Sequence, residues 1–476
     1  MDDKNINNLE SDVCQIRVLV VIASYGMKNI DFLKKLIRSY QGMAMNTDVV
    51  VVSDGPKDCG PDVRVVVGLP SKNPWSLPFA HKRIFAENMD RYDLFVYSED
   101  DMEVTENNIQ AFLSVTPYLA EDEIAGFLRY EVDESGKWSF PEAHGVYHWK
   151  PGSVKQRGNY TIAEFTNEHS AFYLLTQAQL KKVIASGGFL REPYEGRYDM
   201  LCSAATDPYT SCGFKKVICI SAIENFLIHH LSNRYAGVLG VSLPDFMEQI
   251  RMLMAIAKDI HPATRLCKAE SYLSNGEWSK NYYETPNEDL IKFVPDHIGK
   301  VLSIGCGWGA TEAKLKDRGA SVTAIPMDSV IAAKSASLGI DMVYGSLDEC
   351  LAQLEGQVFD CLLMTNLLHL LPNPGQVLEQ CSHFIGRGGA FIISGPNFSC
   401  VRVLAKRLLG IKDYRKLGNF EESGIHLIGP MQVKRYLKKA DLDITKVQWV
   451  NHLPVHGIER KLGRFGASNW LLKACR

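Results

Sequence analysis

The sequence predicts an α/β protein with two domains, each built on an open sheet. Apolar strands alternate with amphipathic helices in both halves of the chain, and a glycine-rich turn, Gly305–Gly309, separates a strand from a helix. About 300 residues precede this turn, so the first half must hold a domain of its own. We expect a first domain over 1–240, a helical linker over 241–281 and a second domain over 282–476.

Composition narrows the class of protein. The 476 residues are 46% hydrophobic and 22% charged, and the net charge of −3 gives no overall attraction to nucleic acid. The 12 cysteines include no C-x-x-C pair, which favours a reducing compartment over a disulfide framework. The polar stretch 1–14 lacks the features of a secretory signal, and no apolar run approaches the roughly 20 residues of a membrane span. We therefore expect a cytoplasmic protein.

The first half contains four predicted strands, most of which end in polar residues. The strands are expected over 17–23, 48–52, 63–67 and 93–97. Ser24, Asp54 and the triplet Glu99-Asp100-Asp101 follow the first, second and fourth of them. Open α/β sheets bind ligands at the carboxyl ends of their strands, so we expect these residues at one ligand-binding edge.

The acidic triplet is the chemical centre of this half. Three consecutive carboxylates repel one another unless a cation lies between them. A Mn²⁺ or Mg²⁺ ion carrying phosphate oxygens would relieve that repulsion, because these ions prefer oxygen ligands. The alternative is a solvated acidic turn, or a helix start capped by Asp101.

The apolar strand, the Ser-Asp-Gly turn and the strand with its acidic triplet together resemble the GT-A fold of nucleotide-sugar glycosyltransferases. The resemblance implies that Asp54 contacts the nucleoside, Asp101 holds the metal ion on the donor diphosphate, and Glu99 reaches the ribose or the ion. Glu99 replaces the more usual aspartate. Lys82 and Arg83 lie where a helix of this family approaches the nucleotide, although they could equally form an ordinary basic helix start. The candidates for donor contacts are Ser24, Asp54, Lys82, Arg83, Glu99 and Asp100.

The same resemblance implies a catalytic base and a histidine ligand later in this half. Asp199 is the first choice for the general base and Glu195 the second, and either could instead cap a helix. A histidine near the end of the domain commonly completes the metal site in this family, and His230 is preferred to its neighbour His229. One of the two histidines is expected to pack or to form hydrogen bonds without binding metal.

The second half is organised around the turn after strand 301–304. Its G-x-G-x-G spacing resembles motif I of class I S-adenosylmethionine-dependent methyltransferases, with a Rossmann-like sheet; the alternative is a tight turn in some other α/β domain. The acids expected around the cofactor are missing at Ser303, Pro326 and Ser346, and Asp328 lies two positions late for a ribose contact. The implied cofactor-binding residues are Gly305, Cys306, Gly307, Gly309, Asp328, Leu347 and Asn366.

Methyl transfer to oxygen requires removal of a proton, for which His369 and His426 are candidates. Either histidine could be structural instead. The insertion 401–416 interleaves arginines and lysines with leucines. It predicts a solvated lid helix or, alternatively, an interfacial helix or a cradle for an anionic acceptor.

The two resemblances together imply a bifunctional enzyme. It would transfer a sugar from a nucleotide-sugar donor to a glycan or lipid-linked glycan and O-methylate a sugar of the product, as in bacterial surface polysaccharide synthesis. Peripheral contact with the inner face of the membrane fits such an acceptor. One alternative is nucleotidyl transfer in the first half, although Ser24-Tyr25-Gly26 replaces the expected glycine-rich stretch. Another is a second half that binds S-adenosylmethionine or acceptor without catalysis.

Overall fold

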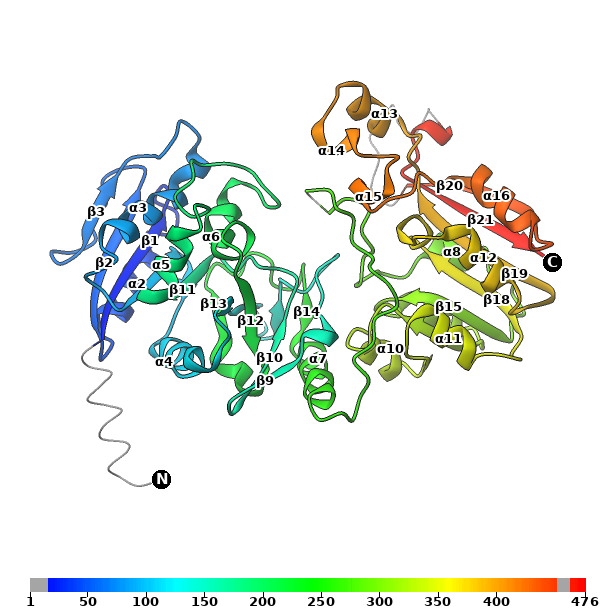
Figure 1. Cartoon of the computed structure of the whole chain (residues 1–476), viewed down its shortest axis with the longest axis horizontal. Helices are drawn as coiled ribbons and strands as arrows, with labels where there is room; N and C mark the ends of the chain where they lie inside the picture. The colour runs from blue at the N-terminus through cyan, green and yellow to red at the C-terminus, as the bar shows by residue number, and fades with distance from the viewer. Residues whose placement is uncertain (1–15, 275, 452–462) are drawn as a thin grey trace. The chain divides into compact units, whose positions relative to one another are not determined.

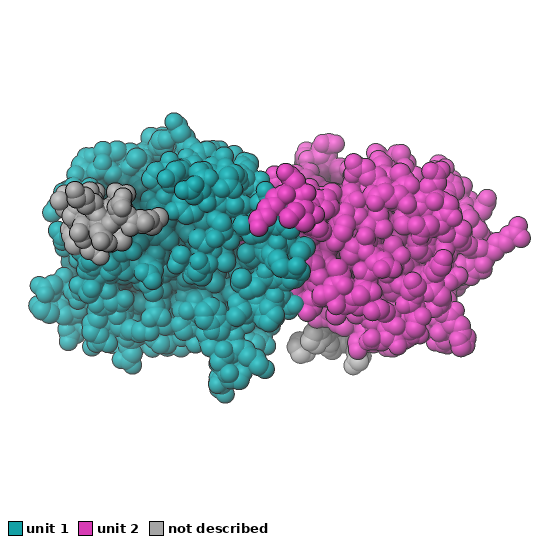
Figure 2. All heavy atoms as spheres, turned by 90° about the horizontal axis from the view of Figure 1, so that it is seen from below, with its two compact units in different colours: residues 1–143, 153–257 teal, residues 144–152, 258–476 magenta. Residues whose placement is uncertain are grey.

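The computed structural model describes residues 16–274, 276–451 and 463–476. These residues form two compact units, which Figure 2 colours separately. The first unit comprises Met1–Ala143 and Ser153–Ala257, and the second comprises His144–Gly152 and Lys258–Arg476. A short piece from the first half of the chain is therefore part of the second unit.

The first unit contains a five-stranded sheet in the order β11-β4-β1-β2-β3. Its strands are β1 (Arg17–Ser24), β2 (Asn46–Ser53), β3 (Arg64–Val67), β4 (Leu94–Glu99) and β11 (Phe172–Thr176). The first four are parallel and β11 runs antiparallel to β4. The neighbouring helices are α2 (Ile30–Gln41), η1 (Pro74–Phe79), α3 (Ala80–Glu87) and α5 (Gln177–Ala185) (Figure 1). Strand β1 is almost wholly apolar because this sheet buries both of its faces.

Two further sheets complete the first unit. One has the order β14-β8-β7-β13-β5, with β5 (Met102–Glu103), β7 (Leu128–Val132), β8 (Trp138–Phe140), β13 (Leu227–His230) and β14 (Val241–Ser242). The other has the order β6-β12-β10-β9, with β6 (Glu123–Ala125), β9 (Lys155–Arg157), β10 (Tyr160–Glu164) and β12 (Lys215–Cys219). The remaining helices are α4 (Glu106–Val115), η2 (Thr116–Tyr118), η3 (Pro151–Ser153, which spans the boundary between the units), α6 (Met200–Thr210), η4 (Ile220–Phe226) and α7 (Leu243–Ile256).

The second unit is built on one seven-stranded sheet in the order β17-β16-β15-β18-β19-β21-β20. Its strands are β15 (Lys300–Cys306), β16 (Ser321–Pro326), β17 (Asp341–Met342), β18 (Phe359–Thr365), β19 (Ile385–Pro396), β20 (Asp443–Val450) and β21 (Asn469–Cys475). The first five are parallel, and β21 runs antiparallel to both of its neighbours. Parallel strands linked by helices give the Rossmann-like sheet that the sequence predicts.

The helices of this unit follow the strands in turn (Figure 1). They are α8 (Glu288–Ile291), α9 (Ala310–Asp317), α10 (Ala332–Ser337), α11 (Leu347–Gln353), η5 (Leu368–Leu370), α12 (Pro374–Ser382), α13 (Val401–Leu408), α14 (Lys412–Arg415), α15 (Phe420–Ser423), α16 (Pro430–Lys438) and η6 (Gly463–Phe465). In the part of the chain that the structure describes, no helix is long and apolar enough to cross a membrane.

The region expected to form a helical linker is divided between the two units. Helix α7 belongs to the first unit, whereas the described residues of 258–281 belong to the second and contain no helix. The helix ends because Asp259 has a positive φ of 55° and Pro262 lacks the backbone N–H that would continue the hydrogen-bond ladder.

Candidate active sites

The carboxyl ends of β1 and β4 bring Ser24 and Asp100 together in the first unit. Ser24 Oγ donates to Asp100 Oδ2 at 2.6 Å, and Asn29 Nδ2 donates to Asp100 Oδ1 at 2.8 Å. Lys57, which sequence analysis did not identify, donates to the Ser24 carbonyl at 2.8 Å and to Ser24 Oγ at 2.6 Å. Burial lowers the pKa of Lys57, although the Asp100 and Asp54 carboxylates oppose that shift. This edge of the sheet therefore carries a cation next to the acids.

Asp54 lies at the same edge, where its side chain accepts a hydrogen bond from the backbone. Its Oδ1 accepts from the Gly26 backbone N–H at 2.9 Å, which ties the turns after β1 and β2 to each other. Gly26 has a φ of 61°, a conformation that glycine adopts without strain. The two turns are thus held in a fixed relation before any ligand binds.

Asp101 and His230 face each other across β5 and β13. His230 Nε2 lies 3.1 Å from Asp101 Oδ2, and His230 Nδ1 lies 2.5 Å from Glu131 Oε1 on β7. Burial opposes protonation of His230, but hydrogen bonds to Asp101 and Glu131 raise its pKa to about 9. Burial also opposes ionisation of Asp101, yet the hydrogen bonds from His230 and Ser232 outweigh it and lower the pKa of this carboxyl. Asp101 and His230, both expected as metal ligands, lie within hydrogen-bond distance of each other, and His230 also contacts Glu131, which the sequence did not reveal.

His229 points away from this pair. Its Nδ1 lies 3.5 Å from Glu103, and its ring stacks on Tyr130 with centroids 4.9 Å apart. Successive side chains of a strand project from opposite faces, so only one of two adjacent histidines can reach Asp101. Of the two histidines, His230 is the one in contact with Asp101.

Glu99 has the most perturbed carboxyl of the triplet. Burial and the neighbouring Asp101 charge raise its pKa to about 8, although Arg129 opposes this shift. Arg129 itself is buried and pairs with Glu142 at 2.5 Å. Within the described residues, no cluster of three or more His, Cys, Asp or Glu side chains has the arrangement of a complete metal site. Asp101 and His230 could therefore supply only part of a coordination sphere.

The predicted basic contacts, Lys82 and Arg83, do not join this cluster. Lys82 is buried and pairs with Asp207 on α6, and its Nζ lies 4.2 Å from the centre of the Phe79 ring. Arg83 is exposed and pairs with Glu87 one helical turn later, at 2.7 Å. Among the described residues, no hydrogen bond or ion pair links either side chain to the acidic triplet. The alternative interpretation of an ordinary basic helix start is the better one.

Asp199 caps helix α6. Its Oδ1 accepts from the Cys202 backbone N–H at 2.8 Å. Burial, followed by the charges of Asp199 and Glu99, raises the pKa of the Cys202 thiol, so the first turn of α6 lies near the acidic triplet. Glu195 is exposed in the preceding loop. The role that the structure shows for Asp199 is that of a helix cap.

The glycine-rich turn of the second unit joins β15 to α9. Gly305 and Gly309 have positive φ values of 79° and 76°. A Cβ at Gly307 would collide with the Tyr282 carbonyl, so the lack of a side chain at this position lets the protein's own backbone pack closely. The Cys306 side chain is buried in the core, which leaves only its backbone to face a cofactor.

Asp328 follows β16 but is covered. Residues 264–266 pair with 327–329: Leu266 N donates to the Met327 carbonyl at 2.9 Å and Ser329 N donates to the Thr264 carbonyl at 3.0 Å. Asp328 Oδ1 accepts from two backbone N–H groups at 2.8 Å, and Oδ2 has no partner in the described structure. Burial raises the pKa of Asp328 to about 7. Its expected ribose contact requires residues 264–266 to move.

The expected carboxylate is absent at Ser303, but a glutamate of the next helix lies beside that position. Ser303 Oγ donates to Glu312 Oε1 on α9 at 2.6 Å, and both side chains are buried. The sequence shows Glu312 nine positions after Ser303, but nothing in that spacing identifies the pair. An acid is thus present beside β15, although it comes from α9.

A pocket of about 280 Å³ lies between the first turn of α9 and the carboxyl end of β18. It is lined by Asn281, Glu284, Thr285, Pro286, Asn287, Thr311, Thr365 and Asn366. Asn366 has a φ of 47°. Its side chain accepts from Asn469 Nδ2 at 3.1 Å, which holds it at the carboxyl end of β18. Leu347, the remaining predicted contact, begins α11 and is half-buried.

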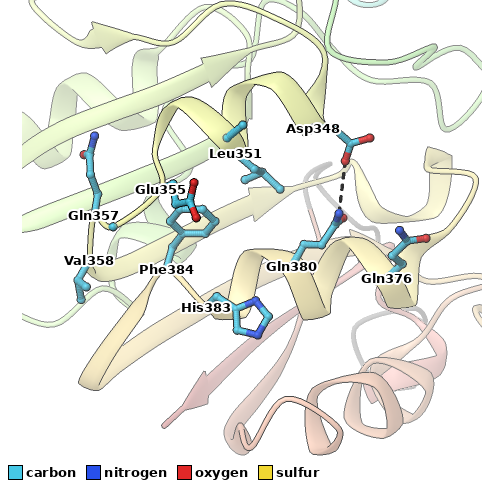
Figure 3. Close-up of a pocket in the computed structure, with 11 residues that line it drawn as sticks. Asp348, Leu351, Glu355, Gln357, Val358, Gln376, Gln380, His383 and Phe384 are labelled. Carbon is cyan, nitrogen blue, oxygen red and sulfur yellow. Dashed lines mark hydrogen bonds between the residues drawn. The ribbon is translucent and has the colours of Figure 1, made fainter.

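A larger hollow of about 730 Å³ lies elsewhere on this unit, between α11 and α12 (Figure 3). Its lining includes Asp348, which accepts from Gln380 Nε2 at 3.3 Å, and it reaches Val358 just before β18 begins. Because Val358 is at the opposite end of β18 from Asn366, this hollow extends away from the glycine turn. Although this hollow is the larger of the two, we do not take it as the candidate site, because it lies away from the glycine turn.

The two candidate histidines are adjacent. The His426 N–H donates to the His369 carbonyl at 2.8 Å. His369 is buried, its Nε2 lies 2.7 Å from the Trp278 carbonyl, and burial lowers its pKa to about 4. His426 is partly exposed, stacks on Phe420, and has Nε2 3.1 Å from the Pro372 carbonyl. His426 is thus the more accessible of the two rings.

Known proteins resemble the second half. A family model described as methionine biosynthesis protein MetW matches residues 286–462, well under half of the chain. A ubiquinone biosynthesis O-methyltransferase of Xylella fastidiosa (strain 9a5c) is 26% identical over 173 residues, covering 35% of this chain and 65% of that protein. Another, from Burkholderia orbicola (strain MC0-3), is 25% identical over 223 residues, covering 43% of this chain and 94% of its own length.

Solved structures that match part of the chain include two described as S-adenosylmethionine-dependent methyltransferases. The protein from Archaeoglobus fulgidus has a TM-score of 0.31 and 16% identity, over 40% of this chain and 91% of that chain. The protein from Mesorhizobium loti has a TM-score of 0.31 and 19% identity, over 40% and 96%. The strand order and the sequence relatives support a class I methyltransferase fold for the C-terminal part of the chain.

Proposed function

We propose that the second unit transfers a methyl group from S-adenosylmethionine to an oxygen of a glycan. The observation that carries this proposal is the 280 Å³ pocket between the start of α9 and Asn366, at the carboxyl edge of a Rossmann-like sheet. Asn281, Glu284 and Asn366 give the pocket a polar lining suited to the amino-acid end of the cofactor. S-adenosylmethionine supplies the electrophilic methyl group when bound.

His426 is our candidate base for that reaction. With Nε2–H donating to the Pro372 carbonyl, a neutral imidazole has its Nδ1 lone pair available to accept the proton of an acceptor hydroxyl. The backbone bond between His426 and His369 fixes the loop that carries it. The similarity to enzymes named as O-methyltransferases supports oxygen as the methylated atom.

We propose sugar transfer from a nucleotide-sugar for the first unit. Support comes from the Asp101–His230 pair and from Lys57, which donates to Ser24, the hydroxyl that in turn donates to Asp100. The two ligands Asp101 and His230 fit a Mn²⁺ or Mg²⁺ ion whose other ligands are diphosphate oxygens and water. Such an ion neutralises charge on the leaving group when bound. Asp199 would remove the acceptor proton, and its hydrogen bond to the Cys202 N–H at the start of α6 would then be weakened.

Two experiments test these assignments separately. Calorimetric titration with S-adenosylmethionine and with its demethylated product tests the second unit, and transfer of a labelled methyl group to supplied glycans tests its chemistry. Tight binding with no transfer would favour a non-catalytic module. A nucleotide-sugar screen read by mass spectrometry, with and without chelator, tests the first unit. Full activity in chelator would overturn metal dependence.

Both reactions are proposed to act on the same glycan, with methylation after glycosylation. Fusion raises the effective concentration of one product at the next site, which is useful only for consecutive reactions. Order-of-addition experiments with purified acceptor test this. Equal methylation rates on unextended and extended acceptor would contradict the sequence of steps.

A further inference from the structure

Helix α13 exposes the apolar side that amphipathic helices normally bury. Val401, Leu404 and Leu408 are 47%, 39% and 89% exposed, and Ala405 between them is exposed as well. Their i, i+3, i+4, i+7 spacing places all four on one side of the helix. The stripe therefore faces solvent over the full length of α13. In Figure 1, α13 and α14 lie at the periphery of the second unit, in orange.

The opposite side of α13 fixes this orientation. Val403 is buried in the core of the unit. Arg402 pairs with Glu277 at 2.9 Å, and Lys406 donates to the Tyr414 hydroxyl at 2.6 Å. Because these contacts come from the face turned toward the protein, the outward position of the leucines is part of the folded arrangement.

The apolar surface continues beyond the helix. Leu409 is 78% exposed and Ile411 is 43% exposed. Single exposed apolar residues are normal, but five large ones between positions 401 and 411 form a local concentration that marks an interaction surface. We call this set the apolar stripe: Val401, Leu404, Leu408, Leu409 and Ile411.

Free cations flank the apolar stripe. Arg407, Lys412 and Arg415 are exposed, and none forms an ion pair within the described residues. The nearby acid, Asp413, is already bonded to Ser274 and lies 3.6 Å from Lys416. The whole chain carries a net charge of −3, so the positive charge here is a local property.

We propose that α13 and the turn after it dock on the surface of an anionic lipid bilayer. The apolar stripe would enter the boundary between headgroups and acyl chains, while Arg407, Lys412 and Arg415 bind lipid phosphates. A second copy of this chain fits less well, because a two-fold contact through the stripe would bring the same cations together. The inference does not depend on methyl transfer, since it concerns binding alone.

Docking of α13 on a membrane would also bear on the acceptor of methyl transfer. This further point rests on the proposed function. Helix α13 follows β19, and β19 pairs with β18 up to Ser394 beside Thr365, a residue of the 280 Å³ pocket. The stripe therefore leaves the sheet at the same edge as the candidate site. This placement suits a lipid-linked glycan.

Co-sedimentation with lipid vesicles tests the proposal on the full-length protein. We expect binding to phosphatidylcholine vesicles that contain phosphatidylglycerol, weak binding to pure phosphatidylcholine, and weakening by salt. Leu404→Glu/Leu408→Glu should lower the partition coefficient at least about tenfold, because it places charge where apolar side chains must enter. Met431→Glu, at a 75%-exposed site on α16, is the matched control and should bind as the wild type does.

A second variant keeps the test decisive if the leucine variant folds poorly. Arg407→Gln/Lys412→Gln/Arg415→Gln should weaken binding to anionic vesicles about tenfold or more and reduce its salt dependence. The proposal fails if the wild-type protein does not bind anionic vesicles, or if both variants bind them as tightly as the wild type does. It also fails if light scattering shows that the stripe holds a dimer and vesicle binding is absent. In each case the methyltransferase assignment would stand.

Discussion

The two candidate sites differ in what holds them together. In the first unit, polar and charged side chains that are distant in the sequence meet directly: Asp101 with His230, and Asp100 with Ser24. In the second, the backbone dominates, because Gly307 packs on the Tyr282 carbonyl and residues 264–266 cover Asp328. The first site is set by side-chain electrostatics and the second by close packing. Substitutions should therefore affect catalysis in the first unit and folding together with binding in the second.

The largest expected effect is at Asp101. Asp101→Asn removes the negative charge of this side chain while keeping its shape, so sugar transfer should fall about a thousandfold. Release of nucleoside diphosphate measures it. Cofactor binding by the second unit should be unchanged and serves as the control for folding. Retained sugar transfer would remove Asp101 from the reaction.

Adjacent histidines provide a matched pair for the next test. His230→Gln should lower sugar transfer about a hundredfold, since it removes the partner of Asp101. His229→Gln should stay within about twofold, because that ring faces Glu103. Equal losses in the two variants would mean that strand alternation does not decide which histidine acts.

Gly307→Ala tests the packed site. The added methyl group meets the Tyr282 backbone, so it should destabilise the second unit by about 3 kcal/mol and abolish cofactor binding. Gly152→Ala is the control in the same unit, because a Cβ there meets nothing within 4 Å. Chemical unfolding measures the first effect and calorimetry the second. A stable Gly307→Ala protein with normal cofactor affinity would show that the backbone yields at this contact.

The smallest effect concerns pH. Burial lowers the pKa of His369 to about 4, below the ordinary value of 6.5, so the unfolded chain binds the proton more readily between these values. The contribution of His369 to stability is present above pH 6.5 and is lost as the pH falls toward 4. Between pH 7 and pH 5 it should amount to about 2 kcal/mol.

His369→Gln should therefore reduce the loss of unfolding free energy between pH 7 and pH 5. His148, whose pKa burial also lowers to about 4, offers an independent second variant of the same kind. Urea unfolding at the two pH values measures both. An unchanged pH dependence would show that the His369 ring is hydrated before the unit unfolds.

Local sequence patterns predicted the elements and the edges at which the sites lie. Strand β1, the acidic triplet after β4 and the turn after β15 were all evident, because each depends on neighbours along the chain. Alternation of side chains along a strand would also have separated His229 from His230, had the partner strand of each been known.

Long-range pairing was not evident from the sequence. Lys57 reaches Ser24 because β1 and β2 pair, and Glu131 reaches His230 because β7 and β13 pair. Asp328 looked available, yet a bridge to residues 264–266 buries it. Lys82 looked like a ligand contact, yet Asp207 on another helix occupies it. These outcomes depend on tertiary contacts that no local spacing encodes.

The segment His144–Gly152 gives the chain an unusual connectivity. It leaves the first unit, contributes the Gly145 carbonyl that accepts from Tyr282 N and the His148 ring that stacks on Tyr282, and returns. The polypeptide thus passes between the units three times. A protease cutting once in residues 258–281 would leave the second unit without a covalent link to part of its own core. During synthesis, His144–Gly152 leaves the ribosome well before the sheet it joins, so the second unit cannot complete its folding until its C-terminal strands have been made.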